Sequence, residues 1–484
     1  MTHSTDIAPQ YDVDVAILGA GTGGMGAYRE AAKYTDRIAL IDGGPLGTTC
    51  ARVGCMPSKL LISAADAAHH VRHAGQFGVF ADEPKIDGRA VMARVRSERD
   101  RFVGFVNEAV QGFGEGHLIR EYGSFVDDHT IQLSGGGTLT ARAIVIATGS
   151  RPSVPPPFEA VGDRLIVNDD VFDWDDLPES AAVFGAGVIG LELGQALHRL
   201  GVRTRLFGRD NLVGPISDPE VRAYARDTFG AEFPAVWHAD TRISREGDEV
   251  VVAWSDYQGD HEERFEYLIA ATGRRPNLDR IGLENTSLPR DERGTPLFDP
   301  LSGRIGDSHV FIAGDANVSL PLLHEAADEG RLAGENAARF PHSYRRARRV
   351  PLGIVFSDPQ IGMAGQSHAQ LLESGIAFET GEVSYDDQGR ARVMGVNKGL
   401  LRIYAEQGTG RLLGMEMIGP RAENLTHLLA WAIDAGETVA DALDKPFYHP
   451  VLEEGVRTAL RKLNAALGFG PNPPLRCIDC GPGA

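Results

Sequence analysis

The sequence predicts an α/β protein with two β-α-β modules in tandem, followed by a smaller α+β domain. Three observations support this fold class. A short apolar run, a glycine-rich turn and an alanine-rich helical stretch follow one another over residues 13–33. The same order returns over residues 181–200. After a basic linker at residues 345–349, short strand-like runs alternate with glycine turns and give way to a helical stretch at residues 424–435.

The composition of the 484 residues is that of an ordinary globular protein. Hydrophobic residues make up 42% of the chain, and the net charge is −19. Because a nucleic-acid footprint needs clustered Lys and Arg, this acidic balance argues against a nucleic-acid partner, and we interpret the short basic run as a solvated linker. No apolar run reaches the roughly 18 residues of a membrane span, and Met1 to Gln10 lacks the apolar core of a secretory signal. We therefore expect a cytoplasmic protein with no membrane partner.

The first glycine turn has the spacing of a dinucleotide-binding fingerprint. Gly19, Gly21 and Gly24 lie between a strand-like run and a helix. Glycines there allow a tight turn and a close approach of a pyrophosphate to the helix N-terminus. Asp42 ends the second strand of the module, 23 residues past the leading glycine, where an acid is expected to hold ribose hydroxyls. The first module is therefore predicted to bind a dinucleotide.

The second module repeats the fingerprint without its acid. Its three glycines are Gly185, Gly187 and Gly190. The same 23-residue offset lands on Gly208, and Arg209 follows. A guanidinium in place of a carboxylate suits a 2′-phosphate, so this site is predicted to favour NADP over NAD. The alternative is that Arg209 is an exposed turn residue neutralised by Asp210.

Two further strand-like runs, at residues 143–149 and 268–273, each end in Ala-Thr-Gly. A proline cluster at residues 155–157 suggests a stiff link between the two modules. The expected division is a first module over residues 1–152, a second over 153–275, a central segment over 276–350 that completes the first, an α+β domain over 351–465 and a tail over 466–484.

The four cysteines form two close pairs. In a reducing compartment, close pairs indicate redox chemistry or metal binding more often than scaffolding. Cys50 and Cys55 lie just after the first dinucleotide fingerprint, and Pro57 fits the first turn of a following helix. Cys55 would then lie near a helix N-terminus, which favours the thiolate. This position favours a redox disulfide over two buried, inert cysteines.

These motifs in combination resemble the flavin-dependent pyridine nucleotide-disulfide oxidoreductases (class I), most of all dihydrolipoamide dehydrogenase. The similarity extends from about residue 12 to about residue 463. The shared motifs are both glycine fingerprints, Cys-x4-Cys-x-Pro-Ser-Lys at residues 50–59, both Ala-Thr-Gly strands, Ala-Gly-Asp at residues 313–315 and His449-Pro450. The resemblance implies that the first module and the central segment bind FAD, that the second module binds NAD or NADP, and that the α+β domain forms a homodimer.

The resemblance also implies which residues contact the two nucleotides. Those expected at the FAD are Gly19, Gly21, Gly24, Asp42, Thr148, Gly149, Gly314, Asp315, Leu323 and His324. Those expected at the NAD(P) are Gly185, Gly187, Gly190, Arg209 and Gly273.

The implied catalytic residues are the Cys50–Cys55 disulfide, Lys59 paired with Glu192, and His449 oriented by Glu454. Lys59 would lie near the reactive edge of the flavin, and Glu192 beside the nicotinamide. His449, ahead of a helix expected to start near Val451, would be the base of thiol–disulfide exchange, since the thiolate is the nucleophile. In the family the histidine acts on the disulfide of the other subunit, so a monomer would be inactive.

The implied function moves electrons between a dithiol substrate or a lipoyl group on a carrier protein, the Cys50–Cys55 disulfide, FAD and NAD(P). Three departures leave alternatives open: Thr48-Thr49 replaces a Gly-Gly pair, Gly208 replaces the acid, and Cys477 and Cys480 form a terminal pair. That pair is half a zinc site at most, so no resident metal is expected. It resembles the second redox pair of large thioredoxin reductases or the terminal thiols of mercuric reductase, unless it is incidental.

The alternative function is therefore an NADPH-dependent reductase of another disulfide or of a soft metal ion. A third reading, a flavin redox sensor, has no need of the base at His449.

Overall fold

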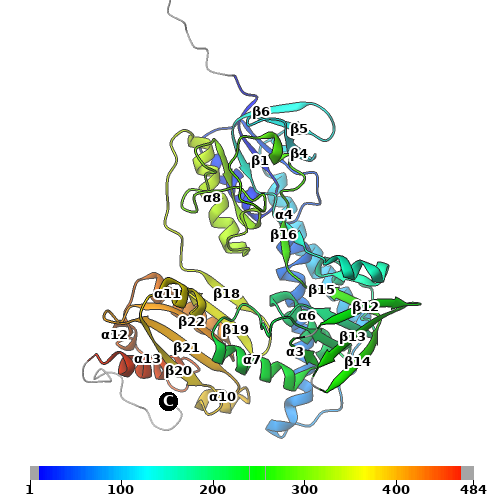
Figure 1. Cartoon of the computed structure of the whole chain (residues 1–484), viewed down its shortest axis with the longest axis vertical. Coiled ribbons are helices and arrows are strands. Elements are labelled where there is room, and N and C mark those ends of the chain that lie inside the picture. Colours follow the sequence, from blue (N-terminus) through cyan, green and yellow to red (C-terminus); the bar gives the residue numbers. More distant parts are fainter. Residues whose placement is uncertain (1–9, 239, 257, 470–484) are drawn as a thin grey trace, which may run out of the picture. The chain divides into compact units, whose positions relative to one another are not determined.

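A computed structural model describes residues 10–238, 240–256 and 258–469. The chain divides into two compact units (Figure 1). Unit 1 comprises the segments 1–57, 96–153 and 274–348, and unit 2 comprises 58–95, 154–273 and 349–484. Helices α3 (Cys55–His73) and α4 (Gly88–Gln111) contribute residues to both units.

Unit 1 is built on a sheet in the order β3-β2-β1-β6-β5-β4, with β17 paired to β6. Strands β1, β2, β3, β6 and β17 are parallel, and β4, β5 and β6 form an antiparallel extension. The strands are β1 (Val13–Leu18), β2 (Ile38–Ile41), β3 (Leu118–Ile119), β4 (Gly123–Phe125), β5 (Thr130–Leu133), β6 (Thr138–Ile146) and β17 (Val310–Ile312), with β7 (Ser150–Pro152) and β16 (Arg274–Pro276) forming a separate pair. The helices are α1 (Thr22–Ala31), α2 (Thr49–Val53), η3 (Leu283–Asn285), η4 (Gly314–Asn317) and α8 (Leu323–Arg339).

Helix α8 packs closely against α1 although some 300 residues of sequence separate them. Glycines make the approach possible. A Cβ on Gly330 would lie 2.1 Å from the carbonyl oxygen of Gly23, and one on Gly334 would lie 2.2 Å from that of Ala27. The central segment therefore completes the first module through both β17 and α8.

The first half of unit 2 is a second parallel sheet in the order β11-β10-β9-β15-β8, beside an antiparallel sheet of β12, β13 and β14. The elements are η1 (Ala74–Phe77), η2 (Pro156–Arg164), β8 (Leu165–Val167), α5 (Asn168–Val171), β9 (Ser180–Phe184), α6 (Val188–Arg199), β10 (Arg203–Phe207), α7 (Pro219–Glu232), β11 (Ala235–Val236), β12 (Thr241–Glu246), β13 (Glu249–Asp256), β14 (Gly259–Phe265) and β15 (Tyr267–Ala270). Strands β9 and β15 at the centre of the parallel sheet have the burial expected of strands covered on two faces.

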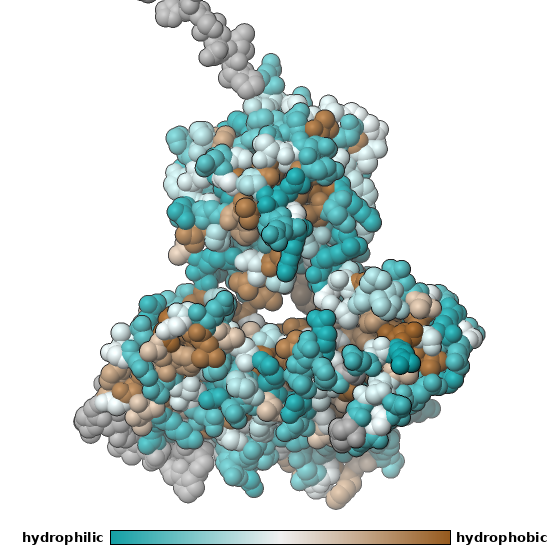
Figure 2. All heavy atoms as spheres, in the orientation of Figure 1, coloured by the Kyte–Doolittle hydropathy of each residue, from teal (hydrophilic) through white to brown (hydrophobic). Residues whose placement is uncertain are grey.

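The second half of unit 2 is an antiparallel sheet in the order β18-β19-β22-β21-β20. Its elements are β18 (Leu352–Val355), β19 (Gln360–Gly365), α9 (His368–Ser374), β20 (Phe378–Ser384), α10 (Gly389–Met394), β21 (Leu400–Glu406), β22 (Leu412–Gly419), α11 (Ala422–Asp434), α12 (Val439–Leu443) and α13 (Glu454–Leu467). Helix α11 packs on β19 and β22, and α13 packs on β20 and β21. The outer face of α11 exposes Leu428 and Trp431, and Figure 2 shows hydrophobic surface there.

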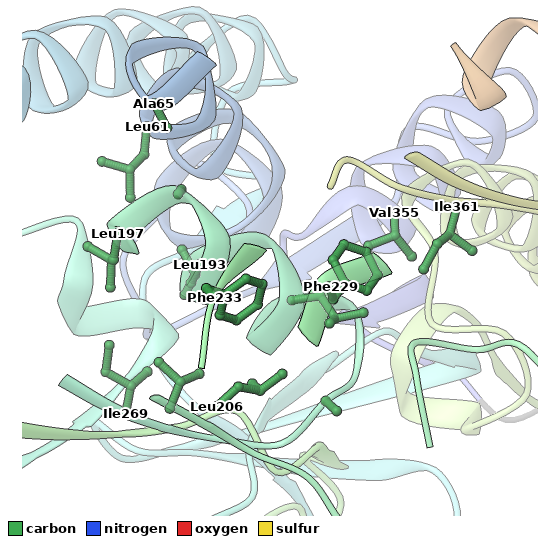
Figure 3. Packing of buried hydrophobic residues seen from close by; sticks show 14 of the residues in the cluster. Leu61, Ala65, Leu193, Leu197, Leu206, Phe229, Phe233, Ile269, Val355 and Ile361 are labelled. Carbon is green, nitrogen blue, oxygen red and sulfur yellow. The ribbon is translucent and has the colours of Figure 1, made fainter. Parts of the chain in front are cut away.

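These observations confirm the predicted fold class of two tandem modules and an α+β domain. The expected boundaries assigned residues 58–95 to the first module, whereas these residues lie in unit 2. In the structure, Leu61 and Ala65 of this segment belong to the same buried cluster as Leu193 and Leu197 of α6 (Figure 3). The apolar face of α3 thus joins the core of unit 2. Among the helices of the described residues, none is both long enough and apolar enough to cross a membrane.

Candidate active site

The first glycine turn connects β1 to α1 and closes so tightly that two of its positions have no room for a side chain. Gly19 has φ +105°, and a Cβ there would lie 2.4 Å from the carbonyl oxygen of Ala147. A Cβ on Gly24 would lie 1.8 Å from the carbonyl oxygen of Gly19. Gly21, in contrast, faces open space at the N-terminus of α1. This arrangement leaves the helix N-terminus accessible to an anion such as a pyrophosphate.

The second glycine turn, between β9 and α6, repeats the first in detail. Gly185 has φ +110°, and a Cβ there would lie 2.2 Å from the carbonyl oxygen of Ala271. A Cβ on Gly190 would lie 1.7 Å from the carbonyl oxygen of Gly185, and Gly187 again faces open space. Each unit therefore contains one complete turn of the dinucleotide-binding type.

The residue that follows the second strand differs between the modules. Gly19 N–H donates to the carbonyl of Ile41, and Gly185 N–H donates to that of Phe207, so Asp42 and Gly208 occupy matching positions. The Asp42 carboxylate accepts hydrogen bonds from Ala20 N (2.7 Å) and Gly44 N (2.8 Å).

At Gly208 the space for a side chain is small. A Cβ would lie 3.2 Å from the Trp237 carbonyl oxygen and 3.3 Å from Ala186 Cβ. Arg209 is 86% exposed, and its Nε lies 3.2 Å from Asp210 Oδ2. The guanidinium is thus at the surface and lies against Asp210, the residue that the alternative interpretation gave as its neutralising partner.

Other residues expected at the FAD lie around the carboxyl ends of β6 and β17 in unit 1. Asp315 Oδ2 accepts a hydrogen bond from Ser150 Oγ at 2.6 Å, and Gly314 N donates to Glu329 Oε2 at 2.7 Å. Thr148 Oγ1 is buried and has no hydrogen-bond partner among the described residues, while Gly149, with φ +68°, faces open space. An orphaned hydroxyl beside an open glycine suits a polar cofactor, so these residues fit FAD.

Leu323 and His324 form the first turn of α8, and both side chains are about half exposed. In unit 2, Gly273 has φ +106° and faces open space after β15, as Gly149 does after β6. The placement of these three residues is compatible with the contacts that the resemblance implies.

The two N-terminal cysteines lie on consecutive helices. Cys50 is in the five-residue helix α2 and is half-buried, whereas Cys55 is the first residue of α3 and is exposed. Helix α3 thus places Pro57 in its first turn and Cys55 at its N-terminus, as expected. Thr48 precedes α2 with φ +59°, a region that favours glycine, and its hydroxyl accepts a hydrogen bond from Ala51 N at 3.2 Å. The family's glycine is therefore replaced by a residue that caps α2.

Lys59 and Glu192 form an ion pair within unit 2. Lys59 Nζ lies 2.7 Å from Glu192 Oε2, and the carboxylate is 4% exposed. The backbone N–H of Phe356 donates to Glu192 Oε1 at 2.9 Å, and the Phe356 ring centroid lies 4.7 Å from Lys59 Nζ. The ammonium therefore has an anion on one side and an aromatic face on another.

His449 and Glu454 form a dyad in the α+β domain. His449 Nδ1 lies 3.0 and 3.2 Å from the two carboxylate oxygens of Glu454, which is buried. The same carboxylate accepts hydrogen bonds from Val451 N and Arg457 Nη2. The His449 side chain is 56% exposed. Helix α13 begins at Glu454, so the expectation of a start near Val451 was wrong: the preceding residues, including Pro450, form the turn that lets this carboxylate face back onto the histidine.

The terminal pair Cys477 and Cys480 lies outside the described residues. In the part of the chain that the structure describes, no three His, Cys, Asp or Glu side chains gather closely enough to hold a metal ion.

Sequence reasoning missed several residues around these sites. Phe356 contributes a backbone N–H and a ring to the Lys59–Glu192 pair, and Ser150 contacts Asp315. Main-chain donors carry no sequence signal. The one available hint for Phe356 was that it follows a strand-like apolar run and precedes Ser-Asp-Pro, a turn sequence.

The fold and the site together define a class of protein, and comparison with known families agrees. The pyridine nucleotide-disulphide oxidoreductase family matches residues 13–330, and the dimerisation domain of the same family matches residues 352–460. The chain belongs to this family, whose members depend on FAD and bind NAD(P). The dimerisation domain supports a homodimer.

Individual relatives point to more than one branch. The chain is 32% identical over 455 residues to a mercuric reductase from Streptomyces lividans, covering 91% of this chain and 93% of the relative. It is 30% identical over 459 residues to dihydrolipoyl dehydrogenase 2 from Haloarcula marismortui, covering 92% and 95%. The relatives therefore leave the substrate open.

Among solved structures, LpdA from Mycobacterium tuberculosis matches with a TM-score of 0.79 at 24% identity, covering 93% of this chain and 99% of that one. The HOCl-induced flavoprotein disulfide reductase RclA from Escherichia coli matches with a TM-score of 0.77 at 21% identity, covering 92% and 99%. At these identities the two structures establish the fold alone.

Proposed function

We propose that this protein is a dithiol/disulfide oxidoreductase of the dihydrolipoamide dehydrogenase type. It exchanges electrons between a dithiol or lipoyl substrate, the Cys50–Cys55 disulfide and NAD(P). The observation that carries the proposal is the His449–Glu454 dyad, because a buried carboxylate on Nδ1 fixes the ring and leaves Nε2 for a substrate proton. A protein that only sensed its nucleotide would not need this base.

In the dithiol half of the reaction, His449 accepts a proton from a substrate thiol. The resulting thiolate attacks Cys50 Sγ, the Cys50–Cys55 bond breaks, and Cys55 leaves as a thiolate. After His449 has released that proton to solvent, it accepts the proton of the second substrate thiol, whose thiolate attacks the substrate sulfur of the mixed disulfide. The bond to Cys50 breaks, Cys50 leaves as a thiolate, and the substrate is left as its disulfide. In the homodimer, each histidine would serve the disulfide of the other subunit.

The glycine turn at Gly19, Gly21 and Gly24, Asp42, Thr148, Gly149 and the Gly314–Asp315 turn would hold FAD. When bound, FAD supplies the two-electron step between thiol and nucleotide chemistry. Lys59 would hold a positive charge at the flavin edge, kept in place by Glu192. The second glycine turn would bind the nucleotide.

The nucleotide preference is proposed to be NADPH over NADH. Gly208 removes the carboxylate that would repel a 2′-phosphate, and the exposed Arg209 guanidinium is free to swing from Asp210 onto a dianion.

A second candidate is an NADPH-dependent reductase of another disulfide or of a soft metal ion. The similarity to a mercuric reductase and the terminal Cys477–Cys480 pair favour it. Thiolates are the ligands that soft metal ions prefer, so the tail would deliver such an ion to Cys50 as a substrate.

A substrate panel separates the two candidates. The full-length protein, with FAD bound, is assayed with dihydrolipoamide and either NAD+ or NADP+, and with oxidised glutathione or Hg²⁺ and either NADH or NADPH, alongside a C477S/C480S variant. The proposal expects lipoamide turnover that the double variant retains. If the protein instead reduces only Hg²⁺ or oxidised glutathione, and the double variant loses that activity, the second candidate would replace the proposal.

A further inference from the structure

A polar cluster around one buried arginine in unit 2 joins the end of helix α6 to three other segments. Arg199, the last residue of α6, is 4% exposed, and its guanidinium contacts three carboxylates. These are Asp66 of α3 at 3.0 Å, Glu232 of α7 at 2.5 Å and Asp358, between β18 and β19, at 3.0 Å. Three carboxylates around one buried guanidinium make this a fixed junction between segments far apart in sequence.

The Lys59–Glu192 pair lies two helical turns before this junction on the same two helices. Glu192 precedes Arg199 by seven residues, and Lys59 precedes Asp66 by seven residues, which keeps both pairs on matching helix faces. The signs are reversed, because α3 contributes the cation to one pair and the anion to the other. Sliding α3 by two turns would bring Lys59 onto Arg199 or Asp66 onto Glu192, so the charges specify one register.

The loop after β18 closes the arrangement along α6. The backbone N–H of Phe356 donates a hydrogen bond to the Glu192 carboxylate, and the Asp358 carboxylate forms an ion pair with Arg199. Between them, Gln195 accepts a hydrogen bond from Asp358 N at 2.8 Å and donates one to Asp358 O at 2.6 Å. One short loop thus contacts three residues along α6 by hydrogen bonds or an ion pair: Glu192, Gln195 and Arg199.

Apolar packing alone fixes this register less strictly. Between the two charge pairs, α3 presents Leu61 and Ala65 to a cluster that contains Leu193 and Leu197 of α6 (Figure 3). Small and medium aliphatic side chains can repack after a shift with little loss, whereas a misplaced buried charge is strongly unfavourable. Burial raises the pKa of the Asp66 carboxyl and Arg199 opposes that effect, as expected of a desolvated partner.

We propose that Asp66 and Arg199 are positioning residues that hold α3 in register on α6, and thereby hold Lys59 on Glu192. Neither residue touches the reacting atoms. The proposal rests on the proposed function, in which Lys59 and Glu192 act beside the flavin and the nicotinamide.

Asp66→Asn is the informative variant. Arg199 keeps Glu232 and Asp358, so the protein should fold, whereas replacing Arg199 would leave three carboxylates close together without the cation between them. Asp66→Glu is the conservative rescue. Asp176→Asn is the matched control, because Asp176 is a half-exposed carboxylate 3.1 Å from Arg89 of α4 in the same unit, outside the cluster.

Two measurements on the FAD-bound proteins test the proposal. In Asp66→Asn, hydrogen exchange of amides in residues 59–66 and 356–358 should accelerate about three- to tenfold. Flavin reduction by NAD(P)H should slow about threefold or more, with KM for the nucleotide and FAD content unchanged. Asp66→Glu should recover most of both effects, and Asp176→Asn should show neither.

Unchanged exchange around Lys59 and Phe356 in Asp66→Asn would overturn the proposal, as would acceleration confined to the residues next to Asp66. If the flavin of the unaltered protein accepts no electrons from either nucleotide, the proposed function fails. Hydrogen exchange still decides the positioning claim in that case, so the two failures are distinguishable.

Discussion

At the scale of single residues, this protein depends on side chains fixed by buried partners. Glu454 is buried and orients an exposed histidine, and Glu192 is buried and orients a partly exposed lysine. In both pairs the exposed member is the one for which we propose a role in the reaction. Such pairing reduces the conformational freedom of the reacting group without removing its access to substrate.

His449→Gln should lower the rate of dithiol turnover by about 10²–10⁴-fold, because the thiol loses its general base. Reduction of the flavin by NAD(P)H should stay within about twofold. Stopped-flow measurement of the two half-reactions separates these effects, and His342→Gln, at an exposed position in unit 1, is the control. Equal loss in both half-reactions would contradict the role of His449 as a thiol base.

Arg209→Ala should raise KM for NADPH about tenfold and leave KM for NADH nearly unchanged, because only the 2′-phosphate meets the guanidinium. Steady-state kinetics with both nucleotides measure the split. Arg226→Ala is the matched control, since Arg226 is also an exposed arginine beside an aspartate that follows it in sequence. An unchanged preference would show that Arg209 is only a neutralised turn residue.

At the scale of elements, glycines allow helix α8 to pack closely on α1 and give the two dinucleotide turns their tight conformation. The two dinucleotide turns match atom for atom at their tight positions, although the surrounding sequences differ. Helix α8 reaches α1 through Gly330 and Gly334, and this contact supports the helix whose N-terminus would bind the pyrophosphate.

Gly330→Ala should lower the free energy of unfolding of unit 1 by about 1–3 kcal/mol, because the new methyl group would overlap the backbone of α1. FAD retention should fall with it. Thermal unfolding and flavin absorbance per protein measure both. Gly104→Ala, in α4 where a Cβ meets nothing within 4 Å, should be neutral or stabilising by up to about 1 kcal/mol. If both variants behaved alike, close packing of α8 on α1 would not be the cause.

At the scale of the whole molecule, the account requires a dimer. The dimerisation domain carries the dyad, and its helix α11 exposes Leu428 and Trp431. Hydrophobic side chains gathered on one exposed helix face are typical of a protein–protein interface.

Leu428→Glu/Trp431→Glu should give a monomer that loses dithiol turnover but still passes electrons from NAD(P)H to an artificial acceptor. Light scattering gives the mass, and parallel assays give the two activities. Leu372→Glu, at an exposed leucine of α9 in the same domain, should stay dimeric and active. A fully active monomer would contradict the exchange of histidines between subunits.

The sequence predicted the parts of this molecule that depend on local pattern. Glycine spacing located both dinucleotide turns, and the Cys-x4-Cys motif indicated the segment for which a redox disulfide is proposed. The resemblance to a family, rather than any local pattern, brought His449 and Glu454 together. The carboxylates around Arg199 come from three distant segments, so no window of sequence contains them. The expected boundaries do not show that residues 58–95 lie in unit 2 for a similar reason: an apolar helix face predicts burial but not the partner that buries it.

The most direct test of the account is a count of thiols after reduction. The FAD-bound protein is reduced anaerobically with one equivalent of NADPH, quenched with an alkylating reagent and digested for mass spectrometry. The account predicts two newly labelled cysteines per subunit, Cys50 and Cys55, and no label on them before reduction. Labelling that is unchanged by NADPH, or new label only on Cys477 and Cys480, would contradict a Cys50–Cys55 redox couple.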